Sequence, residues 1–278
     1  MVEVGSRRAI LEQRPQPAEF AALLAAEDRH FWFSSRNRVI RAVLRKIVSS
    51  LAPGYRVLEA GCGTGNVLRV LEDVCRDGRV VGSELFEAGL RCARTRVRCG
   101  LVQADVRRLP FAAPFDVIGL FDVLEHLPDD AEVLDALYRQ LNQGGRLVIT
   151  VPAHPALWSY ADEYAGHYRR YSSAGLHAVL TRAGFRVDCL GHFMAPLVPL
   201  MWLKRRFSAA SNLRRPLVRE SLREQALSDL TVIPVLNRCL SWLLALEAPL
   251  IAGGWHLPIG TSLVVVGTRA ASGRRPVV

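Results

Sequence analysis

Hydrophobic residues follow two different periods along the middle of this chain. Short apolar runs such as residues 57–60 and 79–84 end at an acid or a glycine turn, and stretches with apolar side chains at helical spacing follow them. The first such helix would carry on its apolar side Val67, Leu68, Val70, Leu71 and Val74. Because strands and helices alternate to about residue 190, the pattern predicts a doubly wound α/β fold with a parallel sheet.

Two helices are expected before this alternation begins. Residues 17–29 have apolar side chains on one helical face, and the aromatic run 31–33 interrupts the pattern. Ser34 or Ser35 can then cap a second helix whose apolar positions continue to Ile47. Residues 1–15 lack such a period, so we expect a polar tail there.

The later part of the alternation ends in a pair of strands. Residues 129–141 and a helix opened by Ser172 or Ser173 precede a strand at 185–189, and a last strand is expected at 262–267. About 70 residues separate these two strands, far more than a hairpin needs. The chain is therefore expected to divide into lid helices (1–50), a core (51–190), an insertion (191–260) and a last strand with a tail (261–278).

The insertion is apolar and interrupted by prolines. Its first run, residues 193–203, leads into Lys204-Arg205-Arg206, and a polar stretch precedes a second apolar part at 232–258. We expect a helical cap that packs on the core. It could close a substrate pocket, form a homodimer face, or rest on a membrane with the basic cluster at the headgroups.

Composition narrows the class of protein. The net charge is +10, yet the basic residues are almost all arginine and are scattered, which does not favour nucleic-acid binding. Six cysteines form no C-x-x-C pair, as expected of reduced thiols in a cytoplasm. We expect neither a secretory signal nor a run of apolar residues long enough to span a membrane.

The turn after residue 60 has the most specific pattern in the chain. Gly61, Gly63 and Gly65 alternate there, and such a turn lets a ligand approach bare backbone at a helix N-terminus. A dinucleotide fingerprint requires glycine where Asn66 stands, and the GK[S/T] ending of a P-loop is absent. Glu84, 19 residues past Gly65, ends the next strand and fits the position of a ribose-binding carboxylate.

The E-x-G-x-G-x-G pattern resembles motif I of the class I S-adenosylmethionine (SAM) methyltransferases. The resemblance covers residues 28–190 and 262–268, with ordered matches at residues 57–66, 79–84, 102–118, 121–127 and 143–151. It implies a Rossmann-like, mostly parallel seven-stranded sheet whose last strand is antiparallel and lies at one edge. It also implies N-terminal lid helices over the SAM pocket.

The resemblance assigns roles around SAM. Glu59 would order the glycine loop and reach the amino end, Glu84 would hold the ribose hydroxyls, and Asp105 would lie beside the adenine. The full set of cofactor contacts that it implies is Trp32, Arg36, Glu59, Gly61, Cys62, Gly63, Gly65, Glu84, Leu85, Asp105, Val106 and Phe121. For Trp32, a purely structural role as a core aromatic is an equal alternative.

The acceptor side of the site is expected around two histidines. Asp122, Glu125 and His126 share the i, i+3, i+4 spacing of one helical face, and His167 lies in a polar cluster downstream. The spacing resembles a divalent-metal segment of ubiquinone-pathway O-methyltransferases and RNA 3′-end 2′-O-methyltransferases. Three alternatives stay open: Asp122, Glu125, His126 and His167 bind a metal ion, His126 or His167 accepts a proton as a catalytic base, or these polar groups are structural.

The sequence thus favours a SAM-dependent methyltransferase of bacterial biosynthesis. It would act on an oxygen, less readily a nitrogen, of a small molecule, a saccharide or a lipid intermediate, in the cytoplasm or at the inner membrane face. A metal-assisted phenol or ribose O-methyltransferase is the alternative within enzymes. An NAD-linked oxidoreductase and a catalytically inactive SAM-fold partner protein are the alternatives from other classes.

Overall fold

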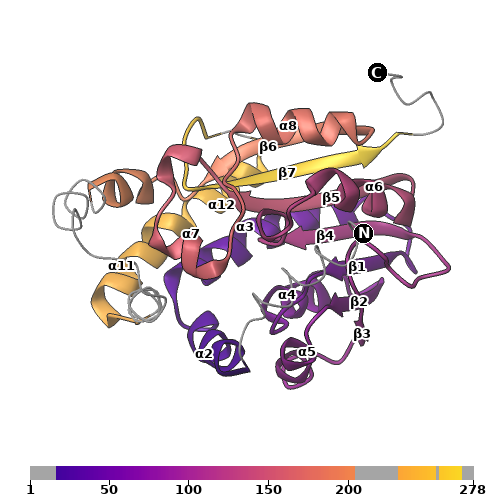
Figure 1. The fold of residues 1–278 in the computed structure, drawn as a ribbon, viewed down its shortest axis with the longest axis horizontal. Helices are drawn as coiled ribbons and strands as arrows, with labels where there is room; N and C mark the ends of the chain where they lie inside the picture. The colour runs from indigo at the N-terminus through magenta and orange to yellow at the C-terminus, as the bar shows by residue number, and fades with distance from the viewer. Residues whose placement is uncertain (1–16, 204–230, 255–256, 271–278) are drawn as a thin grey trace, which may run out of the picture.

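A mixed β-sheet with helices on both faces forms the centre of the molecule (Figure 1). The computed structural model describes residues 17–203, 231–254 and 257–270. Within these residues the sheet has seven strands in the order β3-β2-β1-β4-β5-β7-β6. The strands are β1 (Arg56–Ala60), β2 (Arg79–Glu84), β3 (Gly100–Gln103), β4 (Phe115–Phe121), β5 (Leu141–Pro152), β6 (Phe185–Phe193) and β7 (Ser262–Arg269).

The strand order places a ligand site at a defined point of the sheet. The chain runs outward from β1 through β2 to β3, then returns to form β4 on the other side of β1. In an open parallel sheet, ligands bind beyond the carboxyl ends of the strands at such a reversal. The loops after β1, β2 and β4 therefore form the expected site, and the doubly wound fold predicted from the sequence is confirmed.

The antiparallel direction of β7 is confirmed, but its expected place at the sheet edge is wrong. β7 pairs with β5 on one side and with β6 on the other, with Val265 opposite both Ile149 and Leu190. Its side chains from Ser262 to Thr268 are all buried. A strand buried on both faces belongs inside a sheet, whereas the mixed burial along β6 suits an edge.

Successive side chains of the strands pack into different layers. Val57 of β1 faces a core shared with α3 (Phe31–Val48) and α4 (Asn66–Val74), whereas Leu58 faces α6 (Asp130–Gln140) and α8 (Ser173–Arg182). This alternation explains why both faces of the sheet need helices. Other helices are α2 (Pro17–Glu27), α5 (Glu87–Ala93), η1 (Leu124–His126), η2 (Pro155–Leu157), α7 (Tyr160–Ala165), α11 (Pro234–Ala245) and α12 (Glu247–Ala252), and the described residues 197–203 are helical as well.

The second N-terminal helix begins earlier than the sequence predicted. His30 is the N-cap of α3, and its Nδ1 accepts a hydrogen bond of 3.2 Å from the Trp32 N–H. The aromatic run therefore forms the first turn of α3 and does not interrupt it. Ser34 lies inside the helix and donates to the Phe31 carbonyl at 3.0 Å, so neither serine is the cap. An imidazole acceptor can replace the usual Ser or Asp at this position.

The chain after β6 returns to the core through α11 and α12. Both helices pack against α3 and contribute Leu244, Ala248 and Ile251 to the core. The Glu247 carboxylate accepts hydrogen bonds from the Met194 and Ala195 N–H groups at 2.6 and 2.8 Å, which joins the two ends of the insertion. The predicted Lys204-Arg205-Arg206 cluster, the polar stretch after it and both terminal tails lie outside the described residues. None of the described helices has the length and apolar character needed to cross a bilayer.

Candidate active site

The glycine loop after β1 requires glycine for two separate reasons. Gly61, Gly63 and Gly65 have φ values of 75°, 51° and 78°, which other residues rarely adopt. A Cβ on Gly61 would lie 2.7 Å from a Val123 methyl, and one on Gly65 would lie 3.1 Å from Ala93. A Cβ on Gly63 would meet no atom within 4 Å. The backbone at Gly63 is thus the point where a ligand can approach the loop.

Glu84 at the end of β2 is bound to this loop. Its Oε2 accepts a hydrogen bond of 2.9 Å from the Gly63 N–H, and its Oε1 accepts one of 2.9 Å from the Phe86 N–H. Burial raises the pKa of Glu84, and the backbone donors act against that shift. Each carboxylate oxygen can accept a second hydrogen bond, so Glu84 can still receive two sugar hydroxyls.

Glu59 at the carboxyl side of β1 is a buried acid with an unsatisfied oxygen. It is 3% exposed, and its Oε2 has no hydrogen-bond partner among the described residues. Burial raises its pKa well above the usual value, while the Arg36 charge acts in the opposite direction. A buried acceptor without a partner is unfavourable, and the cationic amino group of SAM would satisfy it. The residues of the loop therefore fit the cofactor that the sequence implied.

The lid helix α2 is tied to the glycine loop by an ion pair. The Thr64 hydroxyl and the Arg96 guanidinium both donate to the Glu27 carboxylate, and Arg96 also donates to the Leu24 carbonyl at 2.8 Å. Both side chains of the Arg96–Glu27 pair are less than 10% exposed. Sequence reasoning missed Glu27 and Arg96, because nothing in the pattern relates two charges 69 residues apart.

Asp122 lies at the end of β4 in a strained left-handed conformation, with φ of 53°. Arg36 donates to its Oδ2 at 2.7 Å, and the Thr150 hydroxyl donates to its Oδ1 at 3.1 Å. Arg36 also donates to Asn66 Oδ1 at 3.2 Å and lies over the Trp32 ring, 5.1 Å from its centroid. The predicted residues Trp32, Arg36 and Asp122 thus form one cluster between α3 and the sheet.

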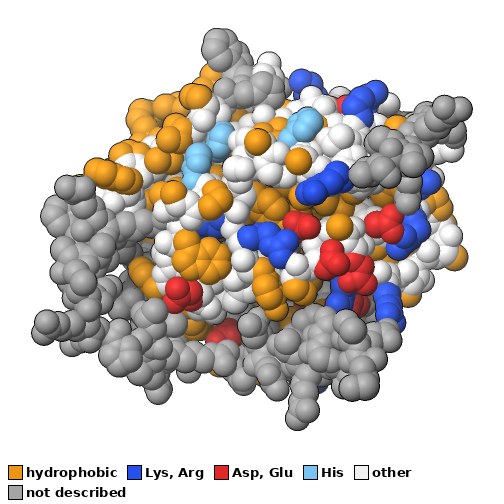
Figure 2. All heavy atoms as spheres, turned by 45° about the horizontal axis from the view of Figure 1, so that its top comes forward, with side chains coloured by type: hydrophobic (Ala, Val, Ile, Leu, Met, Phe, Trp, Pro, Cys, Tyr) orange, Lys and Arg blue, Asp and Glu red, His pale blue; other side chains and the backbone are white. Residues whose placement is uncertain are grey.

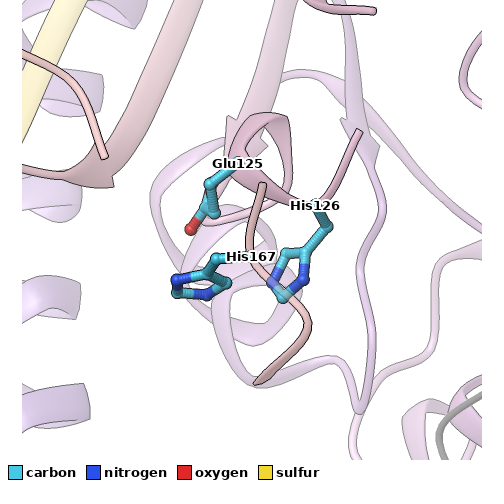
Figure 3. A group of neighbouring side chains, drawn as sticks. All are labelled: Glu125, His126 and His167. Carbon is cyan, nitrogen blue, oxygen red and sulfur yellow. The ribbon is translucent and has the colours of Figure 1, made fainter. Parts of the chain in front are cut away.

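Glu125, His126 and His167 converge beside this cluster (Figure 3). One ligand atom from each side chain lies within 4.8 Å of those of the other two, and the imidazole centroids are 4.6 Å apart. Asp122 does not belong to this group: η1 begins after it, so the single helical face expected for Asp122, Glu125 and His126 does not form.

Burial shifts the pKa values of two residues of this trio, His126 and Glu125. Burial lowers the pKa of His126 to about 3, and the nearby His167 adds to the shift, so His126 is neutral at physiological pH. Burial and the Asp122 charge raise the pKa of Glu125 well above its usual range. The Oε2 of Glu125 is buried without a hydrogen-bond partner among the described residues. The trio therefore combines the neutral imidazole of His126 with a buried acid, Glu125, one of whose carboxyl oxygens lacks a hydrogen-bond partner among the described residues.

His167 is held in one orientation by Asp162 of α7. Its Nδ1 lies 2.9 Å from Asp162 Oδ1. The same oxygen also accepts a hydrogen bond of 2.7 Å from Arg170 Nε. Burial would raise the pKa of Asp162, but the hydrogen bonds from His167 and Arg170 outweigh it and hold that pKa at about 2. An ionised carboxylate at Nδ1 fixes the proton there, which leaves Nε2 of a neutral His167 as the acceptor.

The other predicted cofactor contacts lie along the same loops. Asp105 follows β3 and is half-buried; burial raises its pKa, but hydrogen bonds from Arg107 hold it below the usual range. Leu85, after Glu84, is exposed. Three further predicted contacts are buried in the core, so they can meet a ligand mainly through backbone: Cys62, Val106 and Phe121.

A family model described as a methyltransferase domain matches residues 30–190, more than half of the chain. The chain belongs to this methyltransferase family. The resemblance to SAM-dependent methyltransferases seen in the sequence is therefore confirmed, and SAM is the methyl donor of this methyltransferase domain.

Relatives agree with the family. The chain is 32% identical over 171 residues to a protein of Mycolicibacterium smegmatis described as a probable SAM-dependent methyltransferase. It is 30% identical over 173 residues to a ubiquinone biosynthesis O-methyltransferase of Psychrobacter arcticus. The matches cover 60% and 54% of this chain and 64% and 66% of those proteins, so they span less than two thirds of either relative.

A solved structure shares the fold. The methyltransferase in a Haloferax volcanii complex with the Trm112 methyltransferase activator matches with a TM-score of 0.60, covering 93% of this chain and 96% of that one. At 18% identity this similarity concerns the fold alone. The class I architecture expected from the sequence is thereby confirmed.

Proposed function

We propose that this protein transfers the methyl group of SAM to an oxygen of a small-molecule, saccharide or lipid-intermediate acceptor, with His126 and His167 at the acceptor side. The observation that carries the proposal is their convergence next to the glycine loop. Gly61 packs against Val123, and η1 with His126 follows directly. The imidazoles thus lie at the end of β4, which pairs with β1, where the SAM loop begins.

The chain's own groups suit proton removal from a hydroxyl. SAM supplies an electrophilic methyl group on a sulfonium. Glu59, Glu84 and the glycine loop would hold the donor, which leaves the acceptor oxygen to be aligned with the methyl. Nε2 of His167 would take the hydroxyl proton as the oxygen–carbon bond forms and the carbon–sulfur bond breaks, and His126 would help to position the acceptor oxygen. Asp162 would stabilise the protonated His167 that results.

Two further observations support the choice of acceptor and compartment. Relatives that are 30% and 34% identical to this chain are named ubiquinone biosynthesis O-methyltransferases, and that name states that the methyl group is transferred to an oxygen atom. None of the six cysteines, which all lie in the described part of the chain, forms a disulfide, in keeping with a reducing compartment such as the cytoplasm.

Metal assistance is a second candidate, supported by the trio itself. Glu125, His126 and His167 offer one carboxylate and two imidazole ligands, a set that suits Zn²⁺ or Mn²⁺. Ligand atoms on one ion lie about 3–4 Å apart, because each bond is about 2 Å long, so small rotations would be enough. A bound cation would ionise Glu125, satisfy its Oε2 and activate the acceptor oxygen.

The test follows methyl transfer from radiolabelled SAM to a panel of phenols, sugars and lipid intermediates. We expect His126→Ala and His167→Ala to lower turnover about 100-fold or more while SAM affinity is retained. His177→Ala, at an exposed position on α8, is the matched control.

Chelation separates the two candidates. Loss of activity with a chelator, restored by added metal, would favour metal assistance, whereas unchanged activity would favour a histidine base. Full turnover in both histidine variants would contradict either role. A chain that binds SAM but methylates nothing in the presence of its natural acceptor would instead be an inactive SAM-fold partner protein.

A further inference from the structure

The outer side of α11 is apolar and exposed. Val235 and Trp242 are 76% and 71% exposed, and the exposed large side chains of this helix and its C-cap also include Leu236, Leu243 and Leu246. Their spacing places them on one helical face. Leu200, Trp202 and Leu203, after β6, and Leu250 of α12 are exposed as well.

This face points outward because the opposite side of α11 is fastened to the protein. Asn237 accepts from the Phe31 N–H at 2.6 Å and donates to the Arg29 carbonyl at 2.8 Å. Arg38 donates to the Ser241 carbonyl at 2.8 Å, and Leu244 is buried in the core. The helix thus turns its polar asparagine inward and its largest apolar side chains outward, the reverse of an ordinary surface helix.

Taken together, the segments that carry this face and the sequence that connects them contain more basic than acidic side chains. In the described segments 195–203 and 231–254 the single acid is Glu247, which is buried and accepts from two backbone N–H groups. The single base there, Arg238, is exposed on α11. Residues 204–230, which connect Leu203 to Thr231, contain seven Lys or Arg and three Asp or Glu, a net charge of +4 by sequence.

Exposed apolar side chains also gather on the side of the molecule that the space-filling view shows. Figure 2 shows hydrophobic side chains gathering toward its upper left, with few Lys, Arg, Asp or Glu among them. The exposure of the α11 side chains and of Leu200, Trp202 and Leu203 shows an apolar surface of the same kind. Contiguous exposed apolar surface of this kind marks a contact site.

We propose that the outer face of α11, with residues 200–203, docks on an anionic phospholipid membrane. An amphipathic helix lies in the bilayer interface with its apolar side in the acyl boundary and basic residues at the headgroups. Trp202 and Trp242 suit that boundary, because tryptophan is enriched where apolar chains meet polar headgroups. The exposed Arg238 on α11 and the net charge of +4 in the sequence that links Leu203 to Thr231 favour an anionic surface over a neutral one.

The experiment is co-sedimentation of the full chain with vesicles of phosphatidylcholine alone and of phosphatidylcholine mixed with phosphatidylglycerol. We expect binding to the mixed vesicles, weakened by high salt, and little binding to the neutral ones. The double variant V235S/W242S should partition about tenfold more weakly or worse. Trp158→Ser, which removes a large exposed aromatic elsewhere, should bind as the unmodified chain does.

The circular dichroism spectrum and the SAM affinity of V235S/W242S should both equal those of the unmodified chain. Weaker vesicle binding by this variant could then be attributed neither to a loss of fold nor to a failure of the proposed function. Absence of binding to the mixed vesicles, or equal binding by V235S/W242S, would overturn the proposal. So would a dimer in sedimentation velocity that V235S/W242S converts to a monomer without changing vesicle binding, because the occupant of the face would then be a second copy of the chain.

Discussion

Arg36 of the lid helix α3 donates a hydrogen bond of 2.7 Å to the carboxylate of Asp122 at the end of β4. Their side chains are 8% and 17% exposed, so the pair is largely withdrawn from water. The contact joins the lid to the strand that leads into the candidate catalytic trio. Because Asp122 also has a positive φ, this pair helps to hold a backbone conformation that is otherwise unfavourable.

Removal of Arg36 should therefore destabilise the protein clearly. Arg36→Ala leaves the Asp122 carboxylate without its main partner, and we expect the free energy of unfolding to fall by about 3 kcal/mol. Arg41, also on α3, forms an exposed ion pair with Asp73 of α4, and Arg41→Ala should have little effect. Urea unfolding of the two variants measures the difference. Equal losses of unfolding free energy in the two variants would show that the Arg36–Asp122 pair stabilises the protein no more than an exposed ion pair does.

The Glu84 carboxylate should make SAM binding dependent on pH. Burial raises its pKa, so protonation begins at a higher pH than for an ordinary glutamate. Protonation replaces an acceptor by a donor, and SAM affinity should decrease as the pH falls through this raised pKa. Glu84→Gln should weaken binding at neutral pH by about 1.5–3 kcal/mol and flatten the acid dependence. Calorimetric titration across the acid range measures both effects; an unaltered pH profile in Glu84→Gln would remove Glu84 from the site.

The contacts of Glu27 with Thr64 and Arg96 act as a clamp that holds α2 to the glycine loop. This clamp should control how readily α2 opens away from the loop. Arg96→Ala removes one of the two side-chain donors to Glu27, the other being Thr64, and also the donor to the Leu24 carbonyl. We expect hydrogen exchange in residues 17–27 to become about tenfold faster or more, since local opening depends on such contacts. Arg69→Ala, which loses only an exposed pair with Asp28, serves as the control. Identical exchange in both variants would mean that the clamp does not hold α2 to the loop.

The sequence predicted the parts of the molecule that depend on local patterns. The glycine loop, Glu84 and the strand–helix alternation follow from residue types and their spacing. The first turn of α3 was missed because a histidine cap is unusual and three aromatics look like an interruption. The antiparallel direction of β7 was predicted, but its place inside the sheet was missed because pairing partners are set by packing between distant segments.

At the candidate site, too, some features follow from local sequence patterns and others arise only from the packing of distant segments. His126 and His167 were expected to meet, and the structure brings their rings together. Asp122 lies outside the group of Glu125, His126 and His167, because the helical turn η1 begins only at Leu124, and the i, i+3, i+4 spacing did not reveal this. Glu27, Arg96 and Asp162 were not singled out, because their roles arise only when remote loops fold against one another.

The most direct test of the account is calorimetric titration of the purified chain with S-adenosylhomocysteine, SAM and NAD. The account predicts binding of the first two, no measurable binding of NAD, and loss of binding in Gly63→Val. Gly144→Val is the matched control, because Gly144 also has a positive φ, of 73°, and equally open space around its Cβ position. It lies in the turn within β5 and should leave binding intact. Binding of NAD with no response to SAM, or full SAM affinity in Gly63→Val, would contradict the assignment of the glycine loop.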